Sequence, residues 1–103
     1  MTVVVTAVFE PKAGKKDELA QAMHRGIEAV HKEEGCELYA IHDAEDGTIT
    51  MIEKWTSAEA LDAHTEGRAV AKLREDISNL IEGTPQVTRM SPLPMGTPNQ
   101  GAL

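Results

Sequence analysis

Aromatic side chains are scarce in this chain of 103 residues, which contains one Phe, one Tyr and one Trp. Tyr39 and Trp55 lie in segments that have the composition of β-strands, and Phe9 lies in an earlier apolar segment of the same kind. Because the few rings all lie where strands are expected, we expect them to form the walls of one shared cavity.

Cysteine, basic residues and long apolar segments are scarce too. The single cysteine, Cys36, cannot form a disulfide within the chain, which favours a reducing, cytoplasmic location. Ten Lys and Arg against 17 Asp and Glu give a net charge of −7, which disfavours binding to nucleic acid and to anionic membranes. No apolar segment approaches the roughly 20 residues that span a bilayer, and the N-terminus lacks the basic region of a signal peptide. The length fits one domain.

The first third of the chain predicts a strand followed by a helix. Residues 2–10 are rich in β-branched residues and end at a turn signal, residues 11–14 (Pro-Lys-Ala-Gly). A helix is expected from Lys15 to a stop at Gly35, because apolar residues then recur at helical spacing. The apolar positions are Leu19, Met23, Ile27 and Val30.

A hairpin and a second helical region follow. Residues 37–43 and 48–55 are expected to form two strands joined by residues 44–47, in which Asp-Gly favours a tight turn. Residues 56–59 (Thr-Ser-Ala-Glu) match a capping box that opens a helix. That helix is expected to break near Gly67.

The last part of the chain predicts the rest of this helix, a short strand and a tail. The helix resumes after the break and ends at Gly83, and its apolar face carries Val70, Leu73, Ile77 and Leu80. Residues 86–90 form a candidate last strand. We expect one domain over residues 1–93 and an extended tail rich in Pro and Gly over residues 94–103.

The element order is therefore β-α-β-β-α-β, an α+β fold of the ferredoxin-like kind with helices on one face of a four-stranded antiparallel sheet. Two strands are apolar on both faces, as residues 3–5 (Val-Val-Val) and Ile52 show, whereas a sheet with one solvated face should alternate apolar and polar residues. We expect the second face to meet another copy of the chain, giving a homodimer packed through its sheets.

A set of residues spread over this order of elements carries a family likeness. A Phe, a Pro and a Gly mark the end of the first strand, Glu-Gly-Cys and a Tyr enter the second, and a Glu and a Trp end the third. An Ala-Leu pair and an Ala-His pair then lie on the next helix. These residues are Phe9, Pro11, Gly14, Glu34, Gly35, Cys36, Tyr39, Glu53, Trp55, Ala60, Leu61, Ala63 and His64.

In this pattern the chain resembles the antibiotic biosynthesis monooxygenase superfamily, and within it the small quinol-monooxygenase-like proteins. The resemblance implies a dimeric α/β barrel whose pocket lies between sheet and helices in each protomer. It also implies oxidation of phenolic or quinol-like compounds by O2 without metal or flavin. Haem-degrading members of the superfamily pair a Trp at the position of Trp55 with an Asn on the first strand and a His on the last helix. Here the strand position is Ala7 and the helix has no His, so haem degradation is not expected.

Cofactors and metals are not indicated by the residues themselves. His24 and His31 lie seven residues apart on the first helix, about 10 Å along its axis, too far to share a metal ion. His42 precedes the hairpin, and nothing places it near them. The glycines are scattered, and no glycine-rich phosphate loop precedes a helix. Cys36 has no base nearby in sequence, so we expect a buried, unreactive thiol.

His64 is the candidate catalytic base. If Leu61 faces the core, then His64, one turn later, points toward the pocket, where an imidazole can accept a phenolic proton near neutral pH. The alternative is a histidine at a helix end that bonds a backbone carbonyl and orders the break at Gly67.

Trp55 and Glu53 share one face of a strand. Trp55 is either a flat cavity wall that offers an indole N–H donor or a residue of the hydrophobic core. On the first interpretation we assign it to the catalytic set with His64. Glu53 is either a carboxyl group with a raised pKa in an apolar cavity or, as we rather expect, the ion-pair partner of Arg68 or a Lys.

The remaining candidates would bind substrate. The hydroxyl group of Tyr39 could orient a substrate oxygen, and Phe9 could complete the cavity, although core packing is its more common role. Arg68 could hold a substrate anion, although an exposed charge on a turn is the commoner fate of such a residue.

The resemblance, together with these residues, favours a cofactor-independent monooxygenase that oxidises a quinol or phenolic small molecule with O2. Two alternatives remain open. One is an isomerase or other proton-transfer enzyme acting on a small oxygenated metabolite, which needs a base but no O2. The other is a non-catalytic dimeric protein that binds a hydrophobic ligand.

Overall fold

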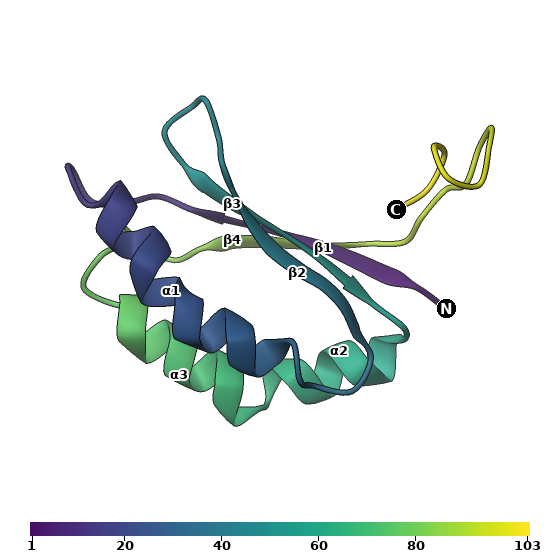
Figure 1. Ribbon diagram of the computed structural model, residues 1–103, viewed down its shortest axis with the longest axis horizontal. Coiled ribbons are helices and arrows are strands. Elements are labelled where there is room, and N and C mark those ends of the chain that lie inside the picture. Colours follow the sequence, from purple (N-terminus) through teal and green to yellow (C-terminus); the bar gives the residue numbers. More distant parts are fainter.

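A four-stranded antiparallel sheet carries three helices on one of its faces (Figure 1). The structure is a computed structural model that describes residues 1–103. The strands lie in the order β2-β3-β1-β4, which confirms the predicted ferredoxin-like α+β fold. The elements are β1 (Val3–Phe9), α1 (Lys16–Val30), β2 (Cys36–Asp43), β3 (Ile49–Trp55), α2 (Ala58–Thr65), α3 (Arg68–Ile77) and β4 (Gln86–Met90).

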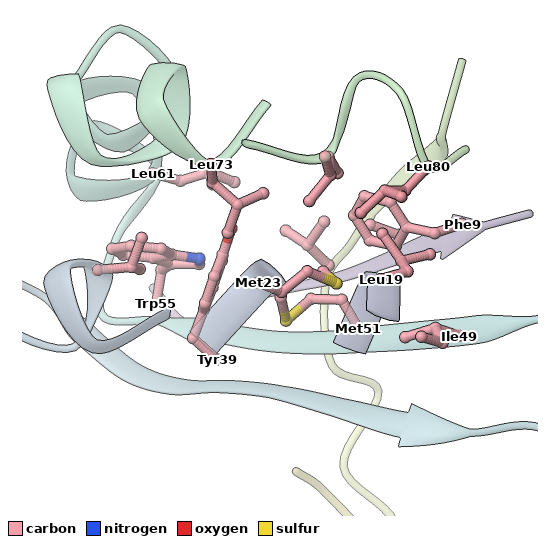
Figure 2. Packing of buried hydrophobic residues seen from close by; sticks show 14 residues of the cluster. Phe9, Leu19, Met23, Tyr39, Ile49, Met51, Trp55, Leu61, Leu73 and Leu80 are labelled. Atoms are coloured by element: carbon pink, nitrogen blue, oxygen red, sulfur yellow. The ribbon is translucent and has the colours of Figure 1, made fainter. Parts of the chain in front are cut away.

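The inner face of the sheet, which the helices cover, is set by alternation along β1 and β3. On β1 the buried residues are Val5, Ala7 and Phe9, and on β3 every second residue from Ile49 to Trp55 is buried. Figure 2 shows the core that these residues build with side chains of the helices. Val5 lies opposite Glu53 on β3 and Arg89 on β4, so this register puts charged groups beside the centre of the inner face.

Helices α1 and α3 lie side by side beneath the sheet (Figure 1). Gly26 permits this approach, because a Cβ atom there would lie 2.7 Å from side-chain atoms of Leu73. The apolar stripe expected on α1 is buried at Leu19, Met23 and Val30 and half-buried at Ile27.

The end of α1 differs from the prediction, because the helix stops at Val30 rather than Gly35. The amide N–H groups of Lys32 and Glu33 bond to carbonyls three residues earlier, at 3.2 and 2.9 Å, and these tight turns close the helix. Gly35 then adopts a φ of +85°, a left-handed conformation that favours glycine. Its carbonyl accepts the N–H of Thr56, which ties this loop to the start of α2.

The second helical region is two helices with Gly67 between them, as the predicted break requires. The capping box over residues 56–59 is wrong: Ser57 is the N-cap, and its hydroxyl oxygen accepts the N–H of Ala60 at 3.1 Å. Helix α3 also ends at Ile77, well before Gly83, although Leu80 in the following turn is still buried.

The hairpin and the tail each depart in detail from expectation. The β2–β3 connection spans residues 44–48, and Asp46 Oδ1 accepts both the N–H and the hydroxyl of Thr48, at 3.0 and 2.6 Å. The last residues are not fully extended, because Met95 and Gly101 are joined by a backbone hydrogen bond of 3.3 Å that closes a loop. The tail leaves the end of β4 on the side away from the helices (Figure 1).

The outer face of the sheet carries no helix (Figure 1). The register places Val4, Ile52 and Met90 on this face, and Val4 and Ile52 are half-buried by their neighbours while Met90 is 38% exposed. This face is therefore apolar in part, as the two-sided strand pattern predicts. None of the helices has the length and apolar character needed to cross a membrane.

Candidate active site

A cavity of about 360 Å³ lies between the inner face of the sheet and helices α2 and α3. Its walls are mainly apolar, and its buried polar groups are few, namely Tyr39, Glu53 and His64. The arginine, serine and threonine residues of the lining are exposed. The apolar lining includes Val5, Ala7, Phe9, Leu61, Val70, Leu73, Ile77 and Val87. An apolar pocket with a small set of convergent polar groups is typical of a small-molecule site.

His64 lies on this wall, in the last turn of α2, with its side chain 4% exposed. Leu61, one turn earlier, is also buried, so the spacing argument places the ring correctly. Its Nδ1 lies 2.7 Å from Glu33 Oε1. The ring therefore bonds a carboxylate, and the alternative in which it bonds a backbone carbonyl is wrong.

The second ring nitrogen of His64, Nε2, has no hydrogen-bond partner within the protein, whereas every fully buried side-chain polar atom has one. Nε2 is therefore the nitrogen that remains accessible at the cavity wall. A carboxylate on Nδ1 favours the tautomer with the proton on Nδ1, which leaves Nε2 as a proton acceptor.

Glu33 is a site residue that the sequence reasoning missed. It lies in the turn after α1, 31 positions before His64, so no local spacing links the two. Gly67 makes room for the carboxylate, because a Cβ there would lie 3.1 Å from Glu33 Oε2. The signal that could have found it is the pair of glycines, since Gly35 and Gly67 both mark close approaches between this loop and the α2–α3 region.

Trp55 stands one layer behind the cavity wall and does not line it. Its side chain is fully buried, and its ring lies against His64 with a centroid distance of 4.6 Å and against Tyr39 at 6.4 Å. Figure 2 shows Trp55, at the end of β3, beside Tyr39, near the start of β2. The expected flat wall for a substrate is therefore not formed by Trp55, which instead supports the residues that do line the cavity.

Glu53 is buried, 6% exposed, and lines the cavity from β3. Its Oε1 accepts the indole N–H of Trp55 at 2.9 Å. No ion pair with Arg68 or a lysine forms, so that expectation is wrong. Burial raises the pKa of Glu53, against the opposing effects of the Trp55 hydrogen bond and of the charges of His64 and Arg89.

Tyr39 and Phe9 line the cavity as expected. The Tyr39 ring packs edge-on against His64, with centroids 5.3 Å apart. Burial raises the pKa of Tyr39 well above its usual range, and the nearby carboxylates of Glu53 and Glu33 act in the same direction. The phenol is therefore protonated at neutral pH and can donate a hydrogen bond.

Arg68 is not brought to the cavity. It is the exposed first residue of α3 and is absent from the lining. Arg74, further along α3, and Arg89, on β4, line the cavity instead, and Arg89 pairs with Asp62 at 2.8 Å. Their sequence signals were weak: Arg74 borders the apolar stripe at Leu73, and Arg89 is two residues from Val87 on the same strand face.

The other histidines and the cysteine lie outside this site. His31 bonds the carbonyl oxygen of Tyr39 at 3.0 Å, and His42 bonds that of Thr50 at 3.1 Å. His24 lies near Glu28 on the exposed side of α1. No three His, Cys, Asp or Glu side chains lie close enough together to hold a metal ion. Cys36 is half-buried, and burial raises the pKa of its thiol.

Comparison with known proteins assigns the chain to a family. Residues 2–76 match the family model described as antibiotic biosynthesis monooxygenase. The chain belongs to the antibiotic biosynthesis monooxygenase family. This membership confirms the resemblance seen in the sequence and supports a monooxygenase-like function.

Individual relatives agree with this membership. Rv0793 of Mycobacterium tuberculosis, named as a candidate monooxygenase, is 27% identical over 92 residues, which are 88% of this chain and 91% of that protein. The solved structure of Rv0793 superposes with a TM-score of 0.82, and 94% of this chain and 100% of that one are covered at 26% identity. SO0527 of Shewanella oneidensis gives a TM-score of 0.77 at 26% identity, with 86% and 88% covered.

Proposed function

We propose that this member of the antibiotic biosynthesis monooxygenase family oxidises a phenolic or hydroquinone small molecule with O2, with His64 as the base. The observation that carries the proposal is the hydrogen bond of 2.7 Å between His64 Nδ1 and Glu33, at the wall of an apolar cavity. A buried imidazole held in this way has one free nitrogen, which can accept a proton from a bound ligand.

The first step is proton transfer. A substrate hydroxyl group gives its proton to His64 Nε2, and the substrate becomes a phenolate or hydroquinone anion. The imidazolium that forms is stabilised by the Glu33 carboxylate at Nδ1, as a buried cation requires a paired anion. The Tyr39 hydroxyl group, which stays protonated, can donate a hydrogen bond to a substrate oxygen.

The second step uses the substrate anion as the reductant. It passes one electron to O2, and the resulting radical pair combines to form a carbon–oxygen bond. Loss of water then completes the reaction: a hydroquinone and O2 give a hydroxyquinone and H2O, so the substrate supplies every electron that O2 takes up. The protein contributes orientation, proton transfer and an apolar, water-poor environment.

A specific observation also favours a second candidate, a proton-transfer enzyme. Glu53 and His64 line the same cavity, and burial raises the pKa of Glu53 while His64 presents a free nitrogen. An acid and a base on one small cavity could move a proton between two atoms of a ligand, as an isomerase does. Such a reaction needs no O2, so its rate would be unchanged under nitrogen.

The experiment is oxygen uptake by metal-stripped protein with a graded set of hydroquinones and anthrones. We compare the wild type with His64→Ala, and use His24→Ala as the matched control because His24 is exposed and away from the cavity. Uptake above autoxidation in the wild type and the control, but not in His64→Ala, supports the proposal. No acceleration across the panel would refute oxidation by O2, and saturable binding without turnover would leave a ligand-binding protein.

We also propose that the chain forms a homodimer through the outer faces of its sheets. The support is the partly apolar face that carries Val4, Ile52 and Met90 and that no helix covers. Ile52→Glu puts a charge at the centre of that face and should give a monomer, measured by light scattering during size-exclusion chromatography. A wild type that is monomeric at every concentration would refute the dimer.

A further inference from the structure

Two arginines line the cavity, one from a helix and one from the sheet. Arg74 comes from α3 and Arg89 from β4, and they are the only lysine or arginine residues in its lining. Both are exposed, whereas Tyr39, Glu53 and His64 are buried. The cavity therefore has a buried end with the proton-transfer groups and a positively charged mouth, in a chain with a net charge of −7.

The two guanidinium groups differ in their partners. Arg89 is held in place by Asp62, with Nη2 and Oδ1 2.8 Å apart. Arg74 has no acidic partner within ion-pair distance, in contrast to Arg25, which bonds both oxygens of Asp76 at 3.0 Å. Arg68 is likewise without an acidic partner, but it does not line the cavity.

The fields of both groups reach the buried end of the cavity. Burial dominates the raised pKa of Tyr39, and the charge of Arg74 acts against it. Burial likewise dominates the raised pKa of Glu53, and Arg89 acts against it. The charges of Arg74 and Arg89 therefore oppose, but do not outweigh, the effect of burial on these two groups.

We propose that the cavity takes a planar hydroxy-aromatic compound that carries a carboxylate at the end opposite its reacting hydroxyl group, with Arg74 as the residue that binds the carboxylate. The orientation of the hydroxyl group toward His64 rests on the proposed function, whereas the carboxylate contact does not. An arginine matches a carboxylate with two parallel N–H donors, which a lysine cannot do.

The size of the preference follows from the exposure of Arg74. A bidentate contact at a solvent-exposed mouth is weaker than a buried one, so we expect a carboxylate ligand to bind about tenfold more tightly than its neutral ester. Arg89 contributes less to the affinity for a carboxylate, because its charge is already paired with that of Asp62.

The test is isothermal titration calorimetry under nitrogen with two probes, 6-hydroxy-2-naphthoate and its methyl ester. The variants are Arg74→Gln and Arg68→Gln, which remove the same charge from the same helix at a cavity position and at a position outside the cavity. The wild type and Arg68→Gln should prefer the carboxylate about tenfold, and Arg74→Gln should lose that preference while its affinity for the ester is unchanged.

Equal affinity for the two probes in the wild type would overturn the proposal without recourse to any variant. A preference that survives in Arg74→Gln would overturn the role of Arg74, and failure of both probes to bind would overturn the ligand class. Because the titration measures binding without O2, a carboxylate preference in a protein that shows no oxygen uptake would refute the proposed oxidation and leave this inference intact.

Discussion

Strand β3 presents two different environments along one buried face. Its first half carries Ile49 and Met51, whose side chains lie near Leu19 and Met23 of α1 in the hydrophobic core (Figure 2). Its second half carries Glu53 and Trp55, whose polar atoms bond each other beside His64. Both halves are equally buried, so burial alone does not separate structure from function in this protein.

The difference between the halves lies in what the buried groups require. Met51 requires only volume, which the helices fill. Glu53, Trp55 and His64 require hydrogen-bond partners, because an unpaired polar group inside a protein is costly. Each has one partner, and Glu53 and His64 also line the cavity, so a ligand can still form contacts with these two side chains.

The largest effect is expected from removing the proposed base, His64, which lies beside the second half of β3. His64→Gln keeps a side chain of similar length but cannot accept and release a proton, so kcat/KM should fall by roughly 10²- to 10⁴-fold. Steady-state oxygen uptake measures this change, and thermal melting serves as the control for folding. An unchanged kcat/KM in a folded variant would show that His64 is not the base.

A substitution in the first half of β3 should instead lower stability and leave turnover largely unchanged. Met51→Ala removes a fully buried side chain and should lower the free energy of unfolding by about 2–5 kcal/mol, because a cavity is left in a close-packed core. Urea denaturation measures this loss. Turnover per folded molecule should change far less than in His64→Gln, and a specific loss of turnover here would break the contrast between the two halves.

A finer comparison separates charge from hydrogen bonding at Glu33. Glu33→Gln can still accept a hydrogen bond from His64 Nδ1, whereas Glu33→Ala cannot, so we expect a loss of about 1.5–3 kcal/mol of transition-state stabilisation in the Ala variant and a smaller loss in Gln. ¹⁵N NMR of the His64 ring should show the proton on Nδ1 in the wild type and in Glu33→Gln.

The same spectra give a readout that a purely structural role would not affect. If Glu33→Ala keeps the same tautomer and the same kcat/KM, then Glu33 does not position the ring. A loss of turnover in Glu33→Ala that Gln partly restores would assign the carboxylate an orienting role.

The smallest effect concerns the dependence of stability on pH. Because burial raises the pKa of Glu53, the folded state holds this proton more tightly than the unfolded state does. Stability from this group is present at low pH and is lost as pH rises from the unfolded pKa through the folded pKa. Relative to the wild type, Glu53→Gln should therefore gain stability as pH rises above about 4.5, the unperturbed value. A constant difference between the two proteins across that range would contradict the raised pKa.

The fold could be predicted from the sequence because its signals are local. The β-branched residues of β1 and the helical spacing of Leu19 and Met23 each fall within one element, and both elements appear in the structure. Boundaries were less certain: the end of α1 depends on backbone turns at Lys32 and Glu33 that no side-chain pattern marks.

The site was predictable only where it follows those local patterns. Spacing from Leu61 placed His64 on the cavity, and the location of the few aromatic rings on predicted strands placed Tyr39 there. Glu53 followed from the strand face that it shares with Trp55. Glu33 and Arg89 escaped prediction because each reaches the site through the tertiary fold, from a loop and from the edge strand respectively. Trp55 lies on the predicted face but behind the wall, since His64 covers it.

The most direct test of the account is a crystal structure of the protein grown under nitrogen with a hydroquinone bound. The account predicts the ligand in the cavity between the sheet and α2–α3, with one hydroxyl oxygen about 3 Å from His64 Nε2 and Glu33 still on Nδ1. A ligand bound elsewhere, or one in the cavity whose hydroxyl groups all face away from His64, would contradict the central claim that this imidazole is the base.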